Sequence, residues 1–232
     1  IRVAHALELL ECQGISPLVE YLEKIWESRK VSERRIFKDP RLREAFKLAL
    51  ELRERGIEHP KFEKLLMLIK DLLRKDKGSK IIVFANYRDT VNRIRDYLNN
   101  EGISCEILIG QASRKGKGLT QEKQLEVLRN FAAGEFNVLI GTSVSEEGLS
   151  IPDVNAVIFF DAVASEIRSI QRRGRTGRHK PGRVIILMAK GTRDEAYYWA
   201  SYHKEKRMRR LLRKLTKQPT LVEFAFGDGN EG

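Results

Sequence analysis

The first 75 residues repeat apolar positions every three or four residues, with polar and charged residues between them. This spacing places the apolar side chains on one face of a helix. Start signals for helices, a polar residue followed by proline, occur at Ser16-Pro17 and Asp39-Pro40, and Gly14 and Gly56 follow helical stretches as stop signals. With a further helix from about Pro60, we predict a helical bundle or arm.

From Ile81 the pattern changes to short continuous apolar runs, which are typical of strands buried on both faces. The runs lie at residues 81–85, 103–109, 137–141, 154–160 and 183–189. Helical or crossover-length segments separate them, at residues 88–100, 120–133 and 165–175, and a long helix is expected over about 192–215. Alternation of strand and helix predicts an α/β domain with a parallel sheet.

A polar, glycine-containing segment, Lys75–Lys80, separates the two patterns. It predicts three parts: a helical domain over 1–77, an α/β domain over 78–216 and a tail over 217–232.

Composition excludes several classes of protein. Hydrophobic residues make up 41% of the 232 residues, too many for a disordered chain, and the apolar runs are too short to span a membrane. Two cysteines, Cys12 and Cys105, do not make a disulfide scaffold and are expected to be reduced thiols of a cytoplasmic, nucleoid-associated protein. The chain begins with Ile1 and shows no signal peptide, so we expect a fragment of a longer protein.

Positive charge is concentrated in one segment. Residues 167–217 hold 17 lysines and arginines against three acidic residues, whereas the rest of the chain is nearly neutral, although the whole carries +12. Such a field usually faces a polyanion, although a solvated basic helix is an equal alternative for residues 203–217.

Polar or glycine-containing loops follow the first three strands, at residues 86–90, 110–118 and 142–149. In a parallel sheet these loops meet at the carboxyl edge, where ligands bind. Their backbone N–H groups, hydroxyls and basic side chains suit a row of phosphates.

The sharpest motif is Gln-Arg-Arg-Gly-Arg-Thr-Gly-Arg at residues 171–178. Arg175 and Arg178 lie three residues apart, so both guanidiniums can point to one place. Paired arginines of this kind suit the charge on a γ-phosphoryl group in transfer.

Together these motifs resemble those of superfamily 2 helicases. Residues 171–178 look like motif VI, residues 141–152 like motif V and residues 81–90 like motif IV, in the same order. Residues 110–121 and 190–198 are similar to the Hef/FANCM family of DNA helicases, and the helical segment resembles that family's insertion between its two motor domains. The resemblance implies that residues 78–216 form the second RecA-like motor domain.

The resemblance also implies roles for single residues. Arg175 and Arg178 would reach the γ-phosphate of ATP, and Gln171, also assigned to the catalytic set, would lie in the same cleft. The ATP cleft would also include Gly148, Ser150 and Arg172. The DNA backbone would be gripped by Arg88, Gly110, Gln111, Arg114, Thr142 and Ser143. Ser150 departs from the family's usual aspartate, which implies weaker contact with the ribose.

Other parts of a motor are missing from the sequence. There is no Gly-x-x-x-x-Gly-Lys-Ser/Thr loop, so ATP and Mg²⁺ would be bound mainly by the N-terminal RecA-like domain of the same polypeptide. Asp194-Glu195-Ala196 mimics a Walker B pair, but we interpret it as the acidic start of a helix. We expect the chain alone not to hydrolyse ATP, and no metal site is expected.

The tail suggests a further partner. Gln218, Leu221 and Phe224 have the spacing of the short peptide that binds sliding clamps of the PCNA type, although Ala225 stands where a second aromatic is common. The alternative is an ordinary linker.

The resulting hypothesis is the C-terminal motor half of an ATP-dependent DNA helicase or translocase that acts on forked or branched DNA during fork repair. Two alternatives stay open: an RNA-directed ATPase of the same superfamily, and a junction-binding scaffold docked on a clamp. No membrane partner is expected.

Overall fold

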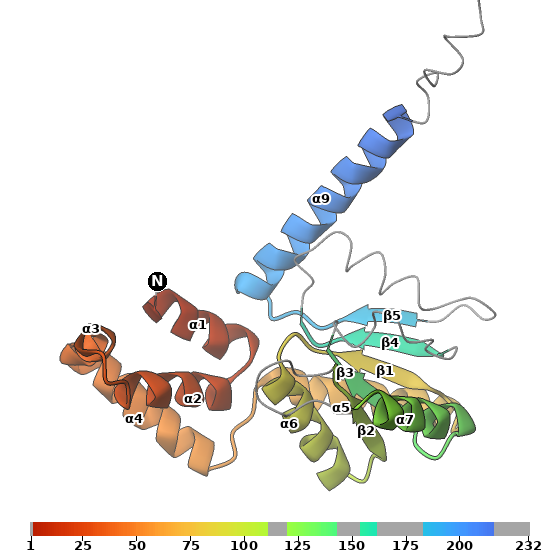
Figure 1. Cartoon of the computed structure of the whole chain (residues 1–232), viewed down its shortest axis with the longest axis horizontal. Helices are drawn as coiled ribbons and strands as arrows, with labels where there is room; N and C mark the ends of the chain where they lie inside the picture. The colour runs from red at the N-terminus through yellow and green to blue at the C-terminus, as the bar shows by residue number, and fades with distance from the viewer. Residues whose placement is uncertain (1, 111–119, 143–153, 162–182, 216–232) are drawn as a thin grey trace, which may run out of the picture.

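The computed structural model describes residues 2–110, 120–142, 154–161 and 183–215. In these residues a helical domain lies beside an α/β domain, and one long helix projects from the second (Figure 1). The bundle at the N-terminus and the sheet that follows it confirm the predicted fold class.

The helical domain consists of α1 (Arg2–Cys12), α2 (Ile15–Trp26), the short α3 (Val31–Arg34) with the 3₁₀ helix η1 (Arg35–Lys38), and α4 (Pro40–Glu54). Its small core is formed by one face each of α1, α2 and α4 together with Phe37 of η1. Asp39 caps α4, because its carboxylate accepts a hydrogen bond of 2.9 Å from the Arg41 N–H.

Two details of this domain differ from the prediction. Helix α2 begins at Ile15, so Gly14 rather than Ser16 is its N-cap. Gly14 has a φ of 99°, and an added Cβ would lie 2.9 Å from the Cβ of His59. Only glycine meets both requirements at this point. The short turns α3 and η1 were not predicted, because four-residue helices carry too little periodicity.

The α/β domain contains a five-stranded parallel sheet in the order β2-β3-β1-β4-β5. The strands are β1 (Ile81–Phe84), β2 (Cys105–Leu108), β3 (Val138–Gly141), β4 (Ala156–Phe159) and β5 (Arg183–Ile186). Each lies inside a predicted apolar run. Helices α5 (Pro60–Lys75), α6 (Arg88–Asn100) and α7 (Gln121–Ala133) flank the sheet.

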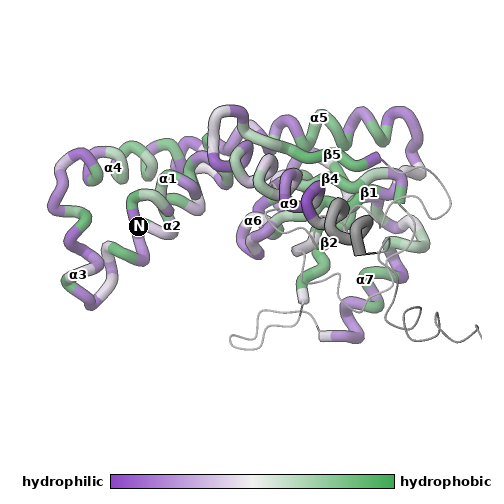
Figure 2. Tube along the Cα trace, turned by 90° about the horizontal axis from the view of Figure 1, so that it is seen from above, coloured by the Kyte–Doolittle hydropathy of each residue, from purple (hydrophilic) through white to green (hydrophobic). Residues whose placement is uncertain are grey.

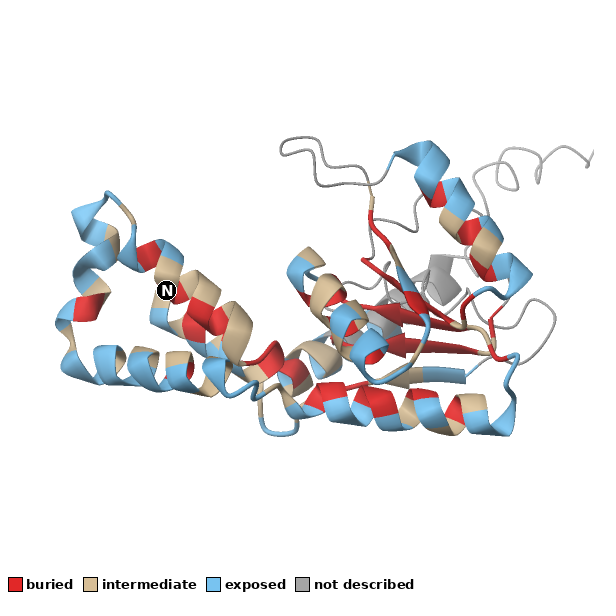
Figure 3. Cartoon of the chain, turned by 90° about the horizontal axis from the view of Figure 1, so that it is seen from below, coloured by how far each residue is buried: buried red, intermediate tan, exposed pale blue. Residues whose placement is uncertain are grey.

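Alternate residues along the central strands β1, β3 and β4 enter two separate cores. Helices α5 and α6 cover one face, where Ile81, Val83, Ile140 and Ile158 are buried. Helix α7 covers the other face with Leu128 and Phe131. The central strands β1, β3 and β4 are buried along their full length (Figure 3), which explains their continuous apolar runs.

The packing of α5 moves the predicted domain boundary. Five apolar residues of α5 belong to the same core as the strands, so α5 is part of the α/β domain. The change in packing therefore lies between α4 and α5, not at the polar segment Lys75–Lys80. That segment is instead the connection from α5 into β1. The periodicity of α5 predicted a helix correctly. It could not predict whether the apolar face of that helix packs on the helical domain or on the sheet.

Helix α9 (Arg193–Leu215) begins after β5 and runs away from the sheet (Figure 1).

Hydropathy along the chain alternates on the helices and is uniformly high on the strands β1 and β4 (Figure 2). Within the described part of the chain, no helix is long and apolar enough to cross a membrane.

Substitutions on α5 test its assignment to the sheet domain. We expect Ile69→Ala, at a fully buried position, to lower the free energy of unfolding by about 2–5 kcal/mol through the lost contacts and the cavity. Met67→Ala, on the exposed face of the same helix, should change it by less than about 0.5 kcal/mol. Urea unfolding followed by circular dichroism measures both, and equal effects would contradict the packing.

Candidate nucleic-acid interface

Three of the residues predicted to grip DNA lie at one edge of the sheet. Gly110, Thr142 and Arg88 follow the carboxyl ends of β2, β3 and β1, which are neighbours in that order. The parallel register aligns Leu108, Gly141 and Phe84, so the loops that follow start at the same level. This confirms, for the described residues, that the loops share an edge.

Arg88 connects two of these loops directly. It is the first residue of α6, and its guanidinium donates a hydrogen bond of 2.9 Å to the carbonyl of Gly110. Its side chain is half-buried, whereas Asn86 and Tyr87 beside it are exposed. Thr142 is only 5% exposed. Of Arg88, Gly110 and Thr142, Arg88 therefore supplies the cationic side chain, and this side chain is partly exposed at the edge of the sheet.

The other predicted site residues lie outside the described residues. These are Gln111, Arg114, Ser143, Gly148, Ser150, Gln171, Arg172, Arg175, Arg178, Gln218, Leu221 and Phe224.

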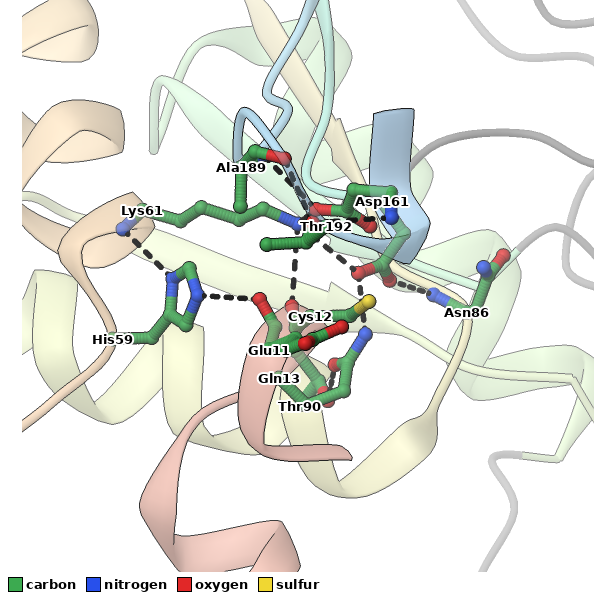
Figure 4. Close-up of polar contacts among 11 residues, drawn as sticks. Glu11, Cys12, Gln13, His59, Lys61, Asn86, Thr90, Asp161, Ala189 and Thr192 are labelled. Carbon is green, nitrogen blue, oxygen red and sulfur yellow. Dashed lines mark hydrogen bonds and ion pairs between the residues drawn. The ribbon is translucent and has the colours of Figure 1, made fainter. Parts of the chain in front are cut away.

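A buried polar cluster that sequence analysis did not predict lies directly beneath this edge (Figure 4). We call it the junction cluster, and it consists of Gln13, Lys61, Thr90, Asp161 and Asp194, each at most 4% exposed. Its members come from the turn after α1, the start of α5, α6, the segment that follows β4 and the start of α9. The cluster thus joins the helical domain to the α/β domain.

Asp161 is the acceptor at the centre of the junction cluster. One carboxylate oxygen accepts from the Gln13 amide at 2.6 Å, and the other accepts from the Asn86 N–H at 2.7 Å. Thr90 donates to the Gln13 carbonyl oxygen at 2.8 Å. The bond to Asn86 fixes the loop after β1, which leads to Arg88 at the start of α6.

Lys61 supplies the positive charge. Its ammonium group forms an ion pair with Asp194, lies 4.0 Å from a carboxylate oxygen of Asp161 and donates at 3.2 Å to the carbonyl of Cys12. Asp194 also accepts from the Ala189 N–H at 3.2 Å. Two carboxylates and one ammonium are buried together, and such groups are tolerated inside a protein only when they are paired and hydrogen-bonded.

Burial shifts the pKa of neighbouring groups. Removal from water raises the pKa of Asp161, while the charge of Lys61 and the bonds from Asn86 and Gln13 oppose that rise. Burial, with the negative charge of Asp194, raises the pKa of the Cys12 thiol to about 12. Cys12 therefore stays protonated at neutral pH, and a thiol is a weaker nucleophile than a thiolate.

His59 connects the two domains at the side of the cluster. Its Nδ1 accepts from the Lys61 N–H at 3.1 Å, which caps α5, and its Nε2 lies 2.9 Å from the carbonyl of Glu11 in α1. Because Nδ1 accepts, Nε2 must carry the proton that is donated to Glu11. The bond from the Lys61 N–H requires an unprotonated Nδ1, and therefore the neutral ring. Burial lowers the pKa of His59, and the bond to the Glu11 carbonyl opposes that shift.

Sequence analysis missed the junction cluster for a physical reason. Asp194 was interpreted as an acidic residue at a helix start, and it does occupy the first turn of α9, but its carboxylate is buried against Lys61. Lys61 stands 133 residues away in the chain, and no local pattern connects the two. The available signal was Asp161, an acidic residue directly after the apolar run at residues 154–160.

Among the described residues no group of three or more His, Cys, Asp and Glu side chains could hold a metal.

Removing the charge of Lys61 tests the junction cluster. Lys61→Met should lower the free energy of unfolding by about 3–5 kcal/mol, because it leaves two buried carboxylates without a cation. Adding Asp194→Asn should restore part of the loss, since the amide oxygen can still accept from the Ala189 N–H. Lys64→Met, on the exposed face of α5, is the matched control. Urea unfolding measures all three, and a Lys61→Met protein as stable as the control would contradict the cluster.

The lowered pKa of His59 predicts a pH dependence of stability. The folded protein disfavours the protonated ring, so this contribution to stability is complete above the unfolded pKa of 6.5 and is lost as the pH falls towards the lowered folded value. His59→Asn keeps an acceptor for the Lys61 N–H and should flatten the slope between about pH 7.5 and 5.5. Urea midpoints across this range measure it, and parallel curves for wild type and His59→Asn would overturn the assignment.

Comparison with known proteins places this arrangement in a family. Residues 61–180 match the "Helicase conserved C-terminal domain", and residues 1–56 match the family "Putative ATP-dependent RNA helicase, helical bundle". The two matches divide the chain between α4 and α5, where the packing also changes.

Individual relatives agree. The chain is 46% identical to the protein named "Putative ATP-dependent RNA helicase MJ1505" of Methanocaldococcus jannaschii, over 93% of the chain and 27% of the relative. It is 39% identical to the Arabidopsis thaliana "DEAD-box ATP-dependent RNA helicase FANCM", over 85% of the chain and 15% of that protein. The crystal structure of the Pyrococcus furiosus Hef helicase domain is 50% identical, with a TM-score of 0.71, and covers 86% of this chain and 41% of the other.

The chain thus spans about a quarter or less of the curated relatives named here. Within the chain, the helical-bundle match precedes the match to the helicase C-terminal domain. The chain belongs to the helicase conserved C-terminal domain family, as the corresponding region of a superfamily 2 helicase of the Hef/FANCM type.

Proposed function

We propose that this chain is the C-terminal motor half of an ATP-dependent DNA helicase or translocase that acts on forked or branched DNA in replication-fork repair. The observation that carries the proposal is the shared carboxyl edge, where Arg88, Gly110 and Thr142 follow three neighbouring parallel strands. Relatives support the substrate, since a Pyricularia oryzae protein 36% identical over 90% of the chain is named "ATP-dependent DNA helicase MPH1".

The two motor halves would work by opening and closing a cleft. Arg175 and Arg178 would neutralise charge on the γ-phosphoryl group of ATP, with Gln171 beside them and Gly148, Ser150 and Arg172 along the cleft. ATP and Mg²⁺ would be held mainly by the N-terminal RecA-like domain, because this chain has no phosphate-binding loop of the Walker A type. The chain by itself would therefore not hydrolyse ATP.

DNA would be held through its backbone. Arg88 and the backbone of Gly110 can meet phosphates, and Gln111, Arg114 and Ser143 would extend the contact along the loops. Contacts to phosphates carry no base sequence, so binding should be insensitive to sequence and should weaken steeply with salt. Closure on ATP would shift this grip relative to the one on the other motor domain.

An RNA-directed ATPase is the second candidate, because the M. jannaschii relative and the helical-bundle family are both named for RNA helicases. Competition between DNA and RNA forks of the same geometry distinguishes the two. A PCNA-type sliding clamp remains a proposed partner through Gln218, Leu221 and Phe224, and a peptide of residues 215–230 that does not bind the clamp at high micromolar concentration would remove it.

Substitution of Arg178 tests the motor. In the polypeptide that joins this chain to a Walker A motor domain, Arg178→Ala should lower the ATPase rate stimulated by forked DNA by about 10³-fold or more, because the transferred phosphoryl loses its cation. Arg74→Ala, an arginine with an 80% exposed side chain on α5, should leave the rate unchanged. An unchanged rate for Arg178→Ala would favour the clamp-docked scaffold instead.

A further inference from the structure

Aromatic side chains gather on the outer surface of α9. Trp199 lies 5.3 Å from Tyr198, 5.8 Å from Tyr202 and 6.2 Å from His203, measured between ring centroids. Trp199 and Tyr202 are 46% and 41% exposed. Among the described residues, none of these four side chains belongs to a hydrophobic core.

The inner contacts of α9 are made by other residues. Tyr197 donates to the Glu8 carboxylate of α1 at 2.8 Å, and Arg193 donates to the other oxygen of Glu8 at 3.1 Å. Asp194 belongs to the junction cluster. The contacts that anchor the first turns of α9 are thus made by residues outside the aromatic group.

Positive charge follows the aromatic group along the same helix. Lys204, Lys206 and Arg207 are exposed in the next turn. The sequence of α9 continues with four more basic residues, Arg209, Arg210, Arg213 and Lys214, against the single acid Glu205 in this stretch. A helix that served only as a docking face for a protein domain would not need this excess of one sign.

The position of α9 relates it to the edge that carries Arg88. Helix α9 begins just after β5, at the carboxyl edge of the sheet, and extends outward from there (Figure 1). In the order of the sheet, only β4 separates β1, which precedes Arg88, from β5, after which α9 begins. Exposed aromatic rings beside basic side chains are the combination with which proteins hold single-stranded nucleic acid, through base stacking and phosphate neutralisation.

We propose that the α9 surface, Trp199, Tyr202 and His203 with Lys204, Lys206 and Arg207, binds unpaired nucleotides of the DNA substrate. Bases stack on Trp199 and Tyr202, and the phosphates between them are neutralised by the basic turn. The inference rests on the proposed function and extends it. It adds a site for single-stranded DNA to the proposed phosphate contacts of the motor domain.

The chain contains two tryptophans, Trp26 and Trp199, which makes a direct test possible. Trp26→Phe leaves Trp199 as the single fluorophore. Titration with an oligothymidylate should quench its emission, and the quenching should saturate together with the anisotropy of the same oligonucleotide carrying a dye. Trp199→Phe leaves Trp26, which packs against Phe37 in the helical domain, and its emission should not respond.

Affinity gives the second readout. Trp199→Ala should weaken oligothymidylate binding by about 5- to 150-fold, the loss that corresponds to one stacked base, and Trp199→Phe should retain part of the affinity. Trp26→Ala, also exposed, is the matched control and should bind like wild type. Circular dichroism checks that the variants fold.

The outcomes separate this inference from the function on which it rests. If DNA binds but Trp199 is not quenched and Trp199→Ala binds normally, the α9 site is wrong and the motor proposal stands. If Trp199 responds to an added motor domain and not to DNA, its surface is a protein interface and the inference is overturned. If forked DNA and oligothymidylate both fail to bind at low salt, the inference and the proposed function fail together.

Discussion

The buried charge of Lys61 is the constraint on which the arrangement of the two domains depends. An ammonium group so far from water is tolerated only with its full set of partners, here Asp194, Asp161 and the carbonyl of Cys12. Those partners come from three separate parts of the chain, so they must be in place together. The helical domain, the end of β4 and the start of α9 therefore take up one mutual arrangement.

The same cluster reaches the candidate nucleic-acid interface. Asp161 accepts from Asn86 on one side and from Gln13 on the other, so the loop that carries Arg88 and the end of α1 share one carboxylate. Movement of the helical domain would have to break a buried hydrogen bond or take the loop along with it. This shared carboxylate would give the proposed contact with DNA a direct connection to the helical domain.

Charged side chains occur in two different environments in this protein. Buried and paired charges lie at the domain junction, while the exposed charges and rings of α9 stand at the outer end of the same edge. Helix α9 takes part in both, since Asp194 in its first turn is buried and the side chains from Trp199 to Arg207 that are described beyond it are largely exposed. One helix can contribute to the junction cluster and carry the proposed binding surface, because the two occupy different turns.

The sequence by itself determined the local structure and the fold class. Continuous apolar runs indicated the five strands, helical periodicity and caps such as Asp39 indicated the main helices, and the loops after the strands indicated the shared edge with Arg88, Gly110 and Thr142. The tertiary structure alone decided that α5 packs on the sheet and that Lys61, Asp161 and Asp194 meet. Periodicity shows that a face is apolar without naming what covers it, and the pairing of buried charges depends on contacts between residues up to 133 positions apart. Such contacts form only when the chain has folded, so no pattern along the sequence could reveal them.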